Sequence, residues 1–184
     1  MNGHHLILGE LQDFVTGKTL PDTHDERYRQ KLARFLVERR GFARSELRPR
    51  RVIPLDIDGR REPAVVDLAV QIDGRWVMIV KYGPGSLVTR HRPALAASRL
   101  LAPYQIPWVV VTNGEDADVL DGADGRVLGS GLAAVPAREE VVRRLAAMDR
   151  TRISEKRRRG EARILYCYDI DGRCPCDGPP CEIE

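Results

Sequence analysis

The sequence has few of the features that would place it in a specialised class of protein. No segment approaches the roughly 18 consecutive apolar residues of a membrane span. Residues 1–11 lack a basic stretch leading into a long apolar segment, so we expect no signal peptide. All four cysteines fall within the last 18 residues instead of forming the distributed framework of a small secreted domain. We therefore expect a cytoplasmic protein with no membrane partner.

A strong excess of one charge is also missing. The net charge of +3 and the pI of about 8.8 are too modest to indicate a nucleic-acid-binding protein by themselves. Only four of the 30 basic residues are lysines, and the other 26 are arginines. Arginine suits bidentate phosphate contacts, but genome base composition explains such a bias equally well. With 184 residues and 42% hydrophobic content, we expect one main globular domain with room for an appendage.

The first half of the chain predicts a lead-in, a helix and three strands. Residues 6–20 are typical of a short hairpin or an irregular lead-in. Residues 25–40 show helical spacing of apolar side chains between N-cap candidates and a C-cap at Gly41. Strands are predicted at 51–56, 64–72 and 76–82. The Asp-Gly turns at 58–59 and 73–74 make these three strands an antiparallel meander.

The second half predicts further helices around one buried strand. Pro93 at an N1-like position opens a helix that ends before Pro103. The wholly apolar residues 108–111 indicate a strand buried on both faces. A closing hairpin around residues 119–128 and a helix over 139–148 follow. The order predicts an α/β fold in which a mixed sheet is flanked by helices.

The composition shifts near Asp149, where arginines become dense. We therefore divide the chain into a main domain, residues 1–149, and a basic helix with a cysteine-rich tail, residues 150–184. A charge run of this kind is usually a solvated helix face, and a contact with phosphate or a partner is the less favoured interpretation.

Two charged residues sit in consecutive apolar strands and could carry chemistry. Magnesium-dependent phosphodiester cleavage needs carboxylates for the ion and a cation for the developing charge. Asp67 lies within the second strand and Lys81 within the third. Side chains alternate along a strand, so Ile79 shares a face with Lys81, and Asp67 can reach that face. A charge inside an apolar strand is costly unless it is paired.

At these residues the sequence resembles the N-terminal nuclease-like domain of type I restriction enzyme R subunits, a PD-(D/E)xK fold. About 90 of the 184 residues are covered. The matching pieces, in order, are residues 25–32, 35–38, 66–68, 79–87, 92–95, 99–101 and 109–114. The order and spacing together are fairly specific, whereas each short motif alone is weak. The resemblance implies a restriction-endonuclease-like sheet with a C-terminal helix and tail added in this chain.

The resemblance implies roles for single residues. Asp67 matches the family's metal-binding aspartate, and Lys81 matches its catalytic lysine. The family's acidic residue two positions before the lysine falls on Ile79, which cannot ligate a metal. The family's glutamine and tyrosine on the next helix fall on Pro93 and Ala97. These departures indicate a nuclease fold that has lost cleavage, so Mg²⁺ is expected only if activity survives.

Two other carboxylates could replace the missing one. Glu26 matches a position where related nucleases place an acid near the metal, and Glu62 could approach from the end of its strand. The plainer interpretation of Glu26 is an acid in the first turn of a helix, favourable to the helix dipole. For Asp67 the plainer interpretation is a buried ion pair with Lys81 and no metal.

A basic segment after the third strand is the first place to look for nucleic acid. Residues 83–86, Gly-Pro-Gly-Ser, could offer backbone N–H groups to a phosphate, although a plain turn is favoured and the spacing is not that of a P-loop. Arg90, His91 and Arg92 then line the entrance to the next helix, whose N-terminal amides favour anions. Together with Ser86 they are the candidate DNA or nucleic-acid contacts. For His91, a surface histidine is the simpler interpretation.

The cysteines of the tail are candidate zinc ligands. They are Cys167, Cys174, Cys176 and Cys181. Structural zinc sites favour paired Cys-x2–4-Cys units, and the single residue between Cys174 and Cys176 departs from that spacing. Free or redox-active thiols, bound Zn²⁺ or another metal, and a disulfide therefore all stay open.

Three functions follow from these observations. The leading hypothesis is a degenerate nuclease-like module that binds nucleic acid or accompanies another protein. The second is an active magnesium-dependent DNA endonuclease with a relocated carboxylate. The third is a protein-interaction scaffold whose cysteine tail binds metal. The sequence does not decide the oligomeric state.

Overall fold

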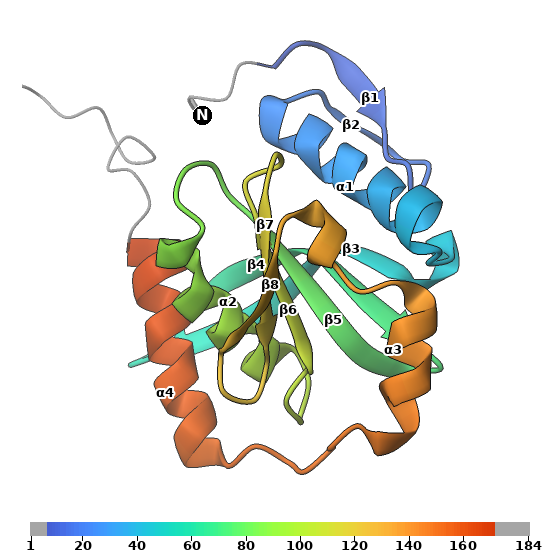
Figure 1. Cartoon of the computed structure of the whole chain (residues 1–184). Coiled ribbons are helices and arrows are strands. Elements are labelled where there is room, and N and C mark those ends of the chain that lie inside the picture. Colours follow the sequence, from blue (N-terminus) through green and yellow to red (C-terminus); the bar gives the residue numbers. More distant parts are fainter. Residues whose placement is uncertain (1–6, 172–184) are drawn as a thin grey trace, which may run out of the picture.

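A six-stranded mixed sheet forms the centre of the molecule in the computed structural model, which describes residues 7–171 (Figure 1). The strands follow one another in chain order across the sheet, and only β5 and β6 are parallel. The six are β3 (Leu47–Ile57), β4 (Arg60–Ile72), β5 (Arg75–Tyr82), β6 (Trp108–Thr112), β7 (Ala117–Asp121) and β8 (Val127–Ser130). This is a mixed α/β architecture of the restriction-endonuclease-like kind.

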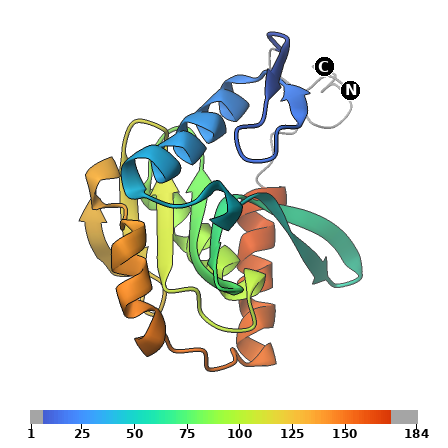
Figure 2. The ribbon, with the colours of Figure 1, turned by 90° about the vertical axis from the view of Figure 1, so that its right-hand side faces the viewer.

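The meander of β3, β4 and β5 is confirmed and is longer than the sequence predicts. Both connecting turns are Asp-Gly pairs with positive φ at each residue, for example 51° at Asp58 and 83° at Gly59. Such turns match the right-handed twist of the strands that they join. The outer part of the β3–β4 hairpin extends away from the body of the molecule (Figure 2).

The β3–β4 hairpin changes faces half-way along. Side chains two residues apart normally share a face of a sheet. Yet Leu47 and Leu68 belong to one apolar cluster, whereas Ile53 and Val66 belong to the other. The reversal occurs at Arg50 and Asp67, which lie between the paired residues on either side. Arg50 has a left-handed backbone, φ 50°, which interrupts the alternation and turns the chain over.

Two helices, α1 (His24–Arg40) and α3 (Arg138–Arg144), cover one face of the sheet (Figure 1). The Thr23 side chain caps α1 by accepting a hydrogen bond from the Glu26 N–H at 3.1 Å, and Gly41 ends it in the left-handed conformation. Leu32 and Leu36 of α1 pack with Val80 in the core beneath. The predicted helix at 25–40 is therefore confirmed, and the helix predicted at 139–148 is shorter and continues as a 3-10 turn to Ala147.

The other face is covered by α2 (Val88–Leu101) and α4 (Glu155–Tyr166) (Figure 1). Its core joins Ile79, Val109 and Leu120 of the sheet to apolar residues of both helices, among them Leu165. The prediction for the start of α2 was wrong, because the helix begins at Val88 and Pro93 lies inside it. A proline there removes one backbone hydrogen bond, which burial of the following alanines and leucine offsets.

Smaller elements complete the structure. A two-stranded hairpin, β1 (Glu10–Gln12) and β2 (Thr19–Pro21), precedes α1 and confirms the expected lead-in. Every residue of β6 is buried, as its apolar run predicts. A π-helical turn, Cys167–Asp171, follows α4. Of the helices in the described part of the chain, none combines the length and apolar character that crossing a bilayer requires. The division of the chain at Asp149 stays a prediction.

Candidate functional site

Asp67 lies on β4 at the point where the hairpin changes faces, and only 6% of it is exposed. Its Oδ1 accepts a hydrogen bond from Arg29 Nε of α1 at 2.7 Å. Its Oδ2 accepts the backbone N–H of Tyr82 at 2.8 Å. Both oxygens of the candidate metal ligand are thus engaged, one of them by a cation.

The arginine on Asp67 is part of a larger set of polar side chains, which we call the α1 cluster. Arg29 Nη1 also donates to Glu26 Oε2 at 3.3 Å. The second oxygen of Glu26 accepts from Gln30 Nε2 at 2.7 Å and from Arg50 Nη1 at 2.9 Å. Arg50 in turn forms a short ion pair with Asp13. The α1 cluster comprises Asp13, Glu26, Arg29, Gln30, Arg50 and Asp67.

The α1 cluster gathers three carboxylates and two guanidinium groups from four parts of the chain. Burial alone would raise the pKa of Asp13. Hydrogen bonds from Arg50 and from the N–H groups of Thr16 and Val15 outweigh burial and hold that pKa below its usual value. Burial would lower the pKa of Arg29, but the charge and hydrogen bond of Asp67 raise it. Both residues are therefore held in their charged forms.

Lys81 has different partners from Asp67. Its Nζ donates to Asp169 Oδ2 at 2.6 Å and to the carbonyl of Val65 at 2.9 Å. Asp169 belongs to the π-helical turn after α4. Among the ion pairs of the described residues none joins Asp67 to Lys81, so the expected ion pair between them was wrong. Asp67 is thus turned toward α1, and Lys81 toward the π-helical turn after α4.

Ile79 is fully buried in the core between the sheet and α2 and α4. A carboxylate here would face Leu165 and other apolar groups, and it would lose its hydration without gaining a partner. The position at which this sequence lacks the family's acidic residue is therefore part of the apolar core.

The carboxylates near Asp67 do not fit a divalent ion. Magnesium takes oxygen ligands in near-ideal octahedral geometry and keeps several waters. Asp67 and Glu26 give their oxygens to arginine and glutamine N–H groups instead. Over residues 7–171 no three His, Cys, Asp or Glu side chains are placed to hold a metal together.

The other candidate carboxylate, Glu62, is far from Asp67. It lies five residues away on the same strand, in the part of the hairpin that extends outward. Five residues of a strand span about 16 Å. Glu62 instead lines a surface hollow with Val52 and Pro54. Only Glu26 comes close to Asp67, through the arginine that they share.

The basic entrance to α2 is largely occupied by internal contacts. Arg90 folds back over Gly83 and donates to the Pro84 carbonyl at 3.0 Å. A side chain at Gly83 would collide with that guanidinium, since a Cβ would lie 2.3 Å from it. The sharp turn 83–86 is therefore filled by Arg90 and does not present an open cradle to a phosphate.

The remaining residues of this segment are also engaged. His91 Nε2 lies 2.8 Å from Asp118 Oδ2 on β7. Arg92 Nη1 donates to Glu161 of α4 at 2.6 Å. Ser86 is exposed, and its carbonyl accepts the Thr89 hydroxyl at 3.0 Å. Ser86, Arg90, His91 and Arg92 thus lie together at one end of α2, and three of them already pair within the chain.

Of the four cysteines, only Cys167 lies within the described residues, and its thiol is free and exposed. It is the first residue of the π-helical turn. Cys174, Cys176 and Cys181 lie outside the described residues, so a zinc site in the tail stays a prediction.

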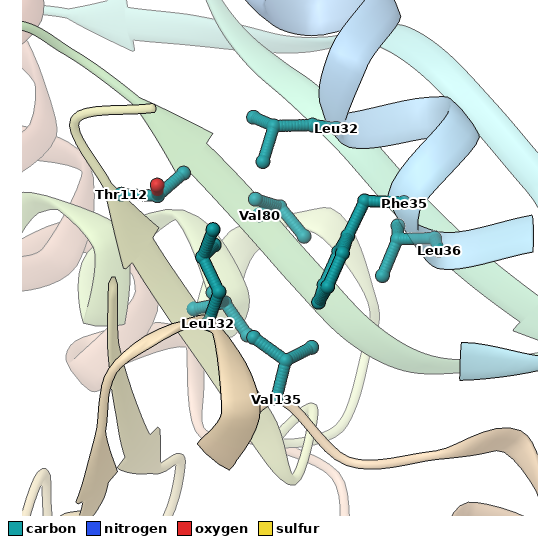
Figure 3. Close-up of a pocket in the computed structure, with 8 residues that line it drawn as sticks. Leu32, Phe35, Leu36, Val80, Thr112, Leu132 and Val135 are labelled. Carbon is teal, nitrogen blue, oxygen red and sulfur yellow. The ribbon is translucent and has the colours of Figure 1, made fainter. Parts of the chain in front are cut away.

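A small apolar cavity between α1 and the sheet offers no alternative site (Figure 3). Leu32, Phe35, Val80 and Val135 are among the residues that enclose it. Its one polar lining residue, Thr112, donates its hydroxyl to the Asp116 carbonyl at 2.7 Å. The cavity leaves about 10 Å³ to water, the lower limit for a single molecule, so no ligand fits there.

Comparison with known families decides the relationship that these residues suggest. The profile of the family described as type I restriction enzyme R protein N terminus matches residues 24–136, well over half of the chain. The chain belongs to this family. Searches of the curated proteins and of the solved structures found no match.

The restriction-enzyme R family match supports a nuclease-like module and divides the site in two. Asp67, Lys81 and the helices α1 and α2 lie inside the matched segment. Helix α4 and Asp169, which holds Lys81, lie outside it. Lys81, which matches the family's lysine, is therefore paired with a residue in a segment that the family profile does not cover.

Sequence reasoning missed five residues of this site: Asp13, Arg29, Gln30, Arg50 and Asp169. All but Gln30 pair with an oppositely charged residue 24 to 88 positions away. A partial signal existed, because Asp67 within an apolar strand requires a cation and Arg29 lies one turn from Glu26 on α1. Nothing local marked Arg50 or Asp169.

Proposed function

We propose that this member of the restriction-enzyme R family is a PD-(D/E)xK-type module that does not cleave phosphodiester bonds. It either binds nucleic acid itself or is an accessory to a partner protein that binds nucleic acid. The observation that carries the proposal is the guanidinium of Arg29 on Asp67. An arginine cannot be deprotonated in a protein, so its charge persists at every working pH. The carboxylate that would hold a metal is neutralised from within the chain.

Two further contacts support loss of cleavage. Ile79 supplies no oxygen and belongs to the core. Lys81, which would stabilise charge on the reacting phosphate, is instead paired with Asp169 at 2.6 Å. A lysine bound to a carboxylate is less available to an incoming phosphate, because the two anions compete for it.

A second candidate is an active magnesium-dependent DNA endonuclease in which Glu26 replaces the missing acid. The observation in its favour is that Arg29 bonds to both Glu26 and Asp67, so the two carboxylates lie near one another. Activity would require Arg29 to leave both carboxylates and Lys81 to leave Asp169. The intact ion pairs favour the first candidate.

A cleavage assay separates the two candidates. We expect no cleavage of supercoiled plasmid or single-stranded DNA by the full chain in Mg²⁺ or Mn²⁺, because no ligand set is free. Lys81→Ala and Lys18→Ala, the latter at an exposed lysine of the β1–β2 hairpin, serve as a matched pair. Cleavage that Lys81→Ala abolishes and Lys18→Ala retains would overturn the proposal in favour of the endonuclease.

A binding assay tests the other half of the proposal. We expect the full chain to bind a short DNA duplex, with the logarithm of the binding constant falling linearly with the logarithm of salt concentration. Each phosphate contact contributes a slope of about −0.9. An absence of binding at about 50 mM salt, where phosphate contacts are strong, would argue against nucleic acid and for a protein-interaction role.

A further inference from the structure

We propose that the outer face of α4 is the nucleic-acid contact surface of this protein, and that Lys156, Arg159 and Arg163 bind the phosphate backbone. This inference rests on the proposed nucleic-acid binding, and it places the contact on α4, away from Asp67 and Lys81. We call these three residues the α4 stripe. All three are exposed on the described structure.

Helix α4 is held in one orientation by its inner residues. Glu161 is buried and accepts from Arg99 Nη1 at 2.8 Å and Arg92 Nη1 at 2.6 Å, both on α2. Arg158 donates to three backbone carbonyls at the C-terminal end of α2, at 2.7 to 2.9 Å. Leu165 is fully buried beside them. These contacts fix which side of α4 faces outward.

The α4 stripe follows that outward side. Residues 156, 159 and 163 are separated by three and four positions, which places them on one face of a helix. No described residue pairs with Lys156 or Arg159. Arg163 lies 3.8 Å from the exposed Asp58, and its side chain is 70% exposed. A pair this long between exposed groups contributes little and leaves the arginine available.

Basic residues are concentrated on α4 and in the five residues before it. Residues 150–166 contain seven basic and two acidic residues, an excess of five positive charges, whereas the whole chain carries +3. Residues 1–149 carry a net charge of +2, and residues 167–184 carry −4. One of the two acids, Glu161, is already paired with Arg99 and Arg92. Positive charge is thus denser along residues 150–166 than over residues 1–149.

The spacing of the α4 stripe suits a duplex. The helix rises 1.5 Å per residue, so Lys156 and Arg163 are about 10 Å apart along its axis. A DNA strand carries one phosphate per 3.4 Å of its axis, so about three phosphates of one strand fall within that length. Three cations facing three phosphates is the expected arrangement for sequence-independent binding.

A membrane surface fits this helix less well. A helix that lies on a bilayer buries an exposed apolar face among the lipids. The apolar residues of α4 already pack against α2 and the sheet, in particular Leu165 and Tyr166. Only the charged side is free, and it favours a polyanion that needs no apolar insertion.

The test compares two triple variants of the full chain. The first replaces the α4 stripe with glutamine at Lys156, Arg159 and Arg163. The control replaces Lys18, Arg39 and Arg126, which are also exposed and also comprise one lysine and two arginines. Both variants lose the same net charge. Affinity for a short DNA duplex is measured from about 50 to 200 mM salt.

We expect the stripe variant to bind at least about tenfold more weakly, with a salt slope smaller by about 3, because three contacts of about 0.9 each are lost. The control should retain the wild-type slope. Equal binding by the two variants would overturn the α4 surface while leaving nucleic-acid binding intact. No duplex binding by the wild type would overturn both the α4 surface and the nucleic-acid-binding part of the proposed function. Tighter binding to phosphatidylserine vesicles than to duplex would overturn the choice of partner.

Discussion

Arginines in the α1 cluster and basic residues in the α4 stripe are the same kinds of side chain in opposite situations. Arg29 and Arg50 each bond to two carboxylates, and those carboxylates are almost completely buried. Lys156 and Arg159 have no described partner and face outward. Charge within the α1 cluster holds four chain segments together, whereas charge on the α4 stripe is exposed to solvent.

The two regions also differ in their relation to the family match. Asp67 and Lys81, which lie inside the matched segment, are both paired within the chain. The residues of the α4 stripe lie beyond residue 136, outside the matched segment. The paired charges inside the matched segment thus tie α1 and the turn after α4 to the sheet.

The strongest challenge to the comparison adds a carboxylate where the family has one. Ile79→Glu should lower the free energy of unfolding by roughly 4 kcal/mol, because it buries an acid without a partner. Ile79→Val, which keeps the position apolar, should cost about 1 kcal/mol. Urea unfolding measures both. A stable Ile79→Glu protein that gains stability on adding Mg²⁺ would show that the site still accepts a metal.

Removing the carboxylate at the centre of the α1 cluster should have the next largest effect. Asp67→Ala leaves the N–H of Tyr82 unpaired and takes a partner from Arg29, so we expect a loss of about 3 kcal/mol. Asp56→Ala on the same hairpin removes an exposed pair with Arg61 and should cost less than about 0.5 kcal/mol. Equal losses in the two variants would contradict a structural role for Asp67.

Acid should weaken the α1 cluster through Asp13. The pKa of Asp13 is lower in the folded protein than in the unfolded chain, so its contribution is present above the unfolded value and is lost as pH falls through the folded value. Asp13→Asn should cost roughly 2 kcal/mol near pH 7. The difference from wild type should shrink below about pH 4, near the unfolded pKa. A difference that does not change with pH would rule out this linkage.

The smallest effect on stability is expected from the α4 stripe. The glutamine triple variant at Lys156, Arg159 and Arg163 should unfold within about 0.5 kcal/mol of wild type, because no described contact of the fold depends strongly on these side chains. Thermal unfolding of this variant beside Asp67→Ala sharpens the contrast between the two regions. A loss of about 2 kcal/mol or more, well beyond the usual range for surface substitutions, would mean that the stripe is part of the fold.

Local chemistry made the scaffold predictable. Thr23 and Gly41 mark the two ends of α1, and the Asp-Gly pairs at 58–59 and 73–74 form the hairpin turns. Each of these signals acts within a few residues, so a sequence displays it directly. The start of α2 was misplaced because Pro93 suggested a first helical position, whereas burial of the helix keeps the proline inside.

The candidate site was only half predictable. Asp67 and Lys81 could be identified as a pair of charges in apolar strands, but their actual partners could not. Arg29 reaches Asp67 across 38 positions, and Asp169 reaches Lys81 across 88. Such pairs depend on how a helix lies on the sheet and on where a strand reverses its faces. Short-range sequence patterns carry no information on either feature.

The left-handed backbone of Arg50 also bears on how the long β3–β4 hairpin finds its alignment. In an ordinary strand, slipping by two residues restores the inside-outside pattern, so misaligned pairings compete with the native one. Here the inner half of the hairpin feeds one apolar cluster and the outer half the other, with the change at Arg50 and Asp67. A two-residue slip would move Arg50 out of alignment with Asp67 and would expose apolar side chains to water. The reversal of faces at Arg50 and Asp67 therefore favours a single register of β3 against β4.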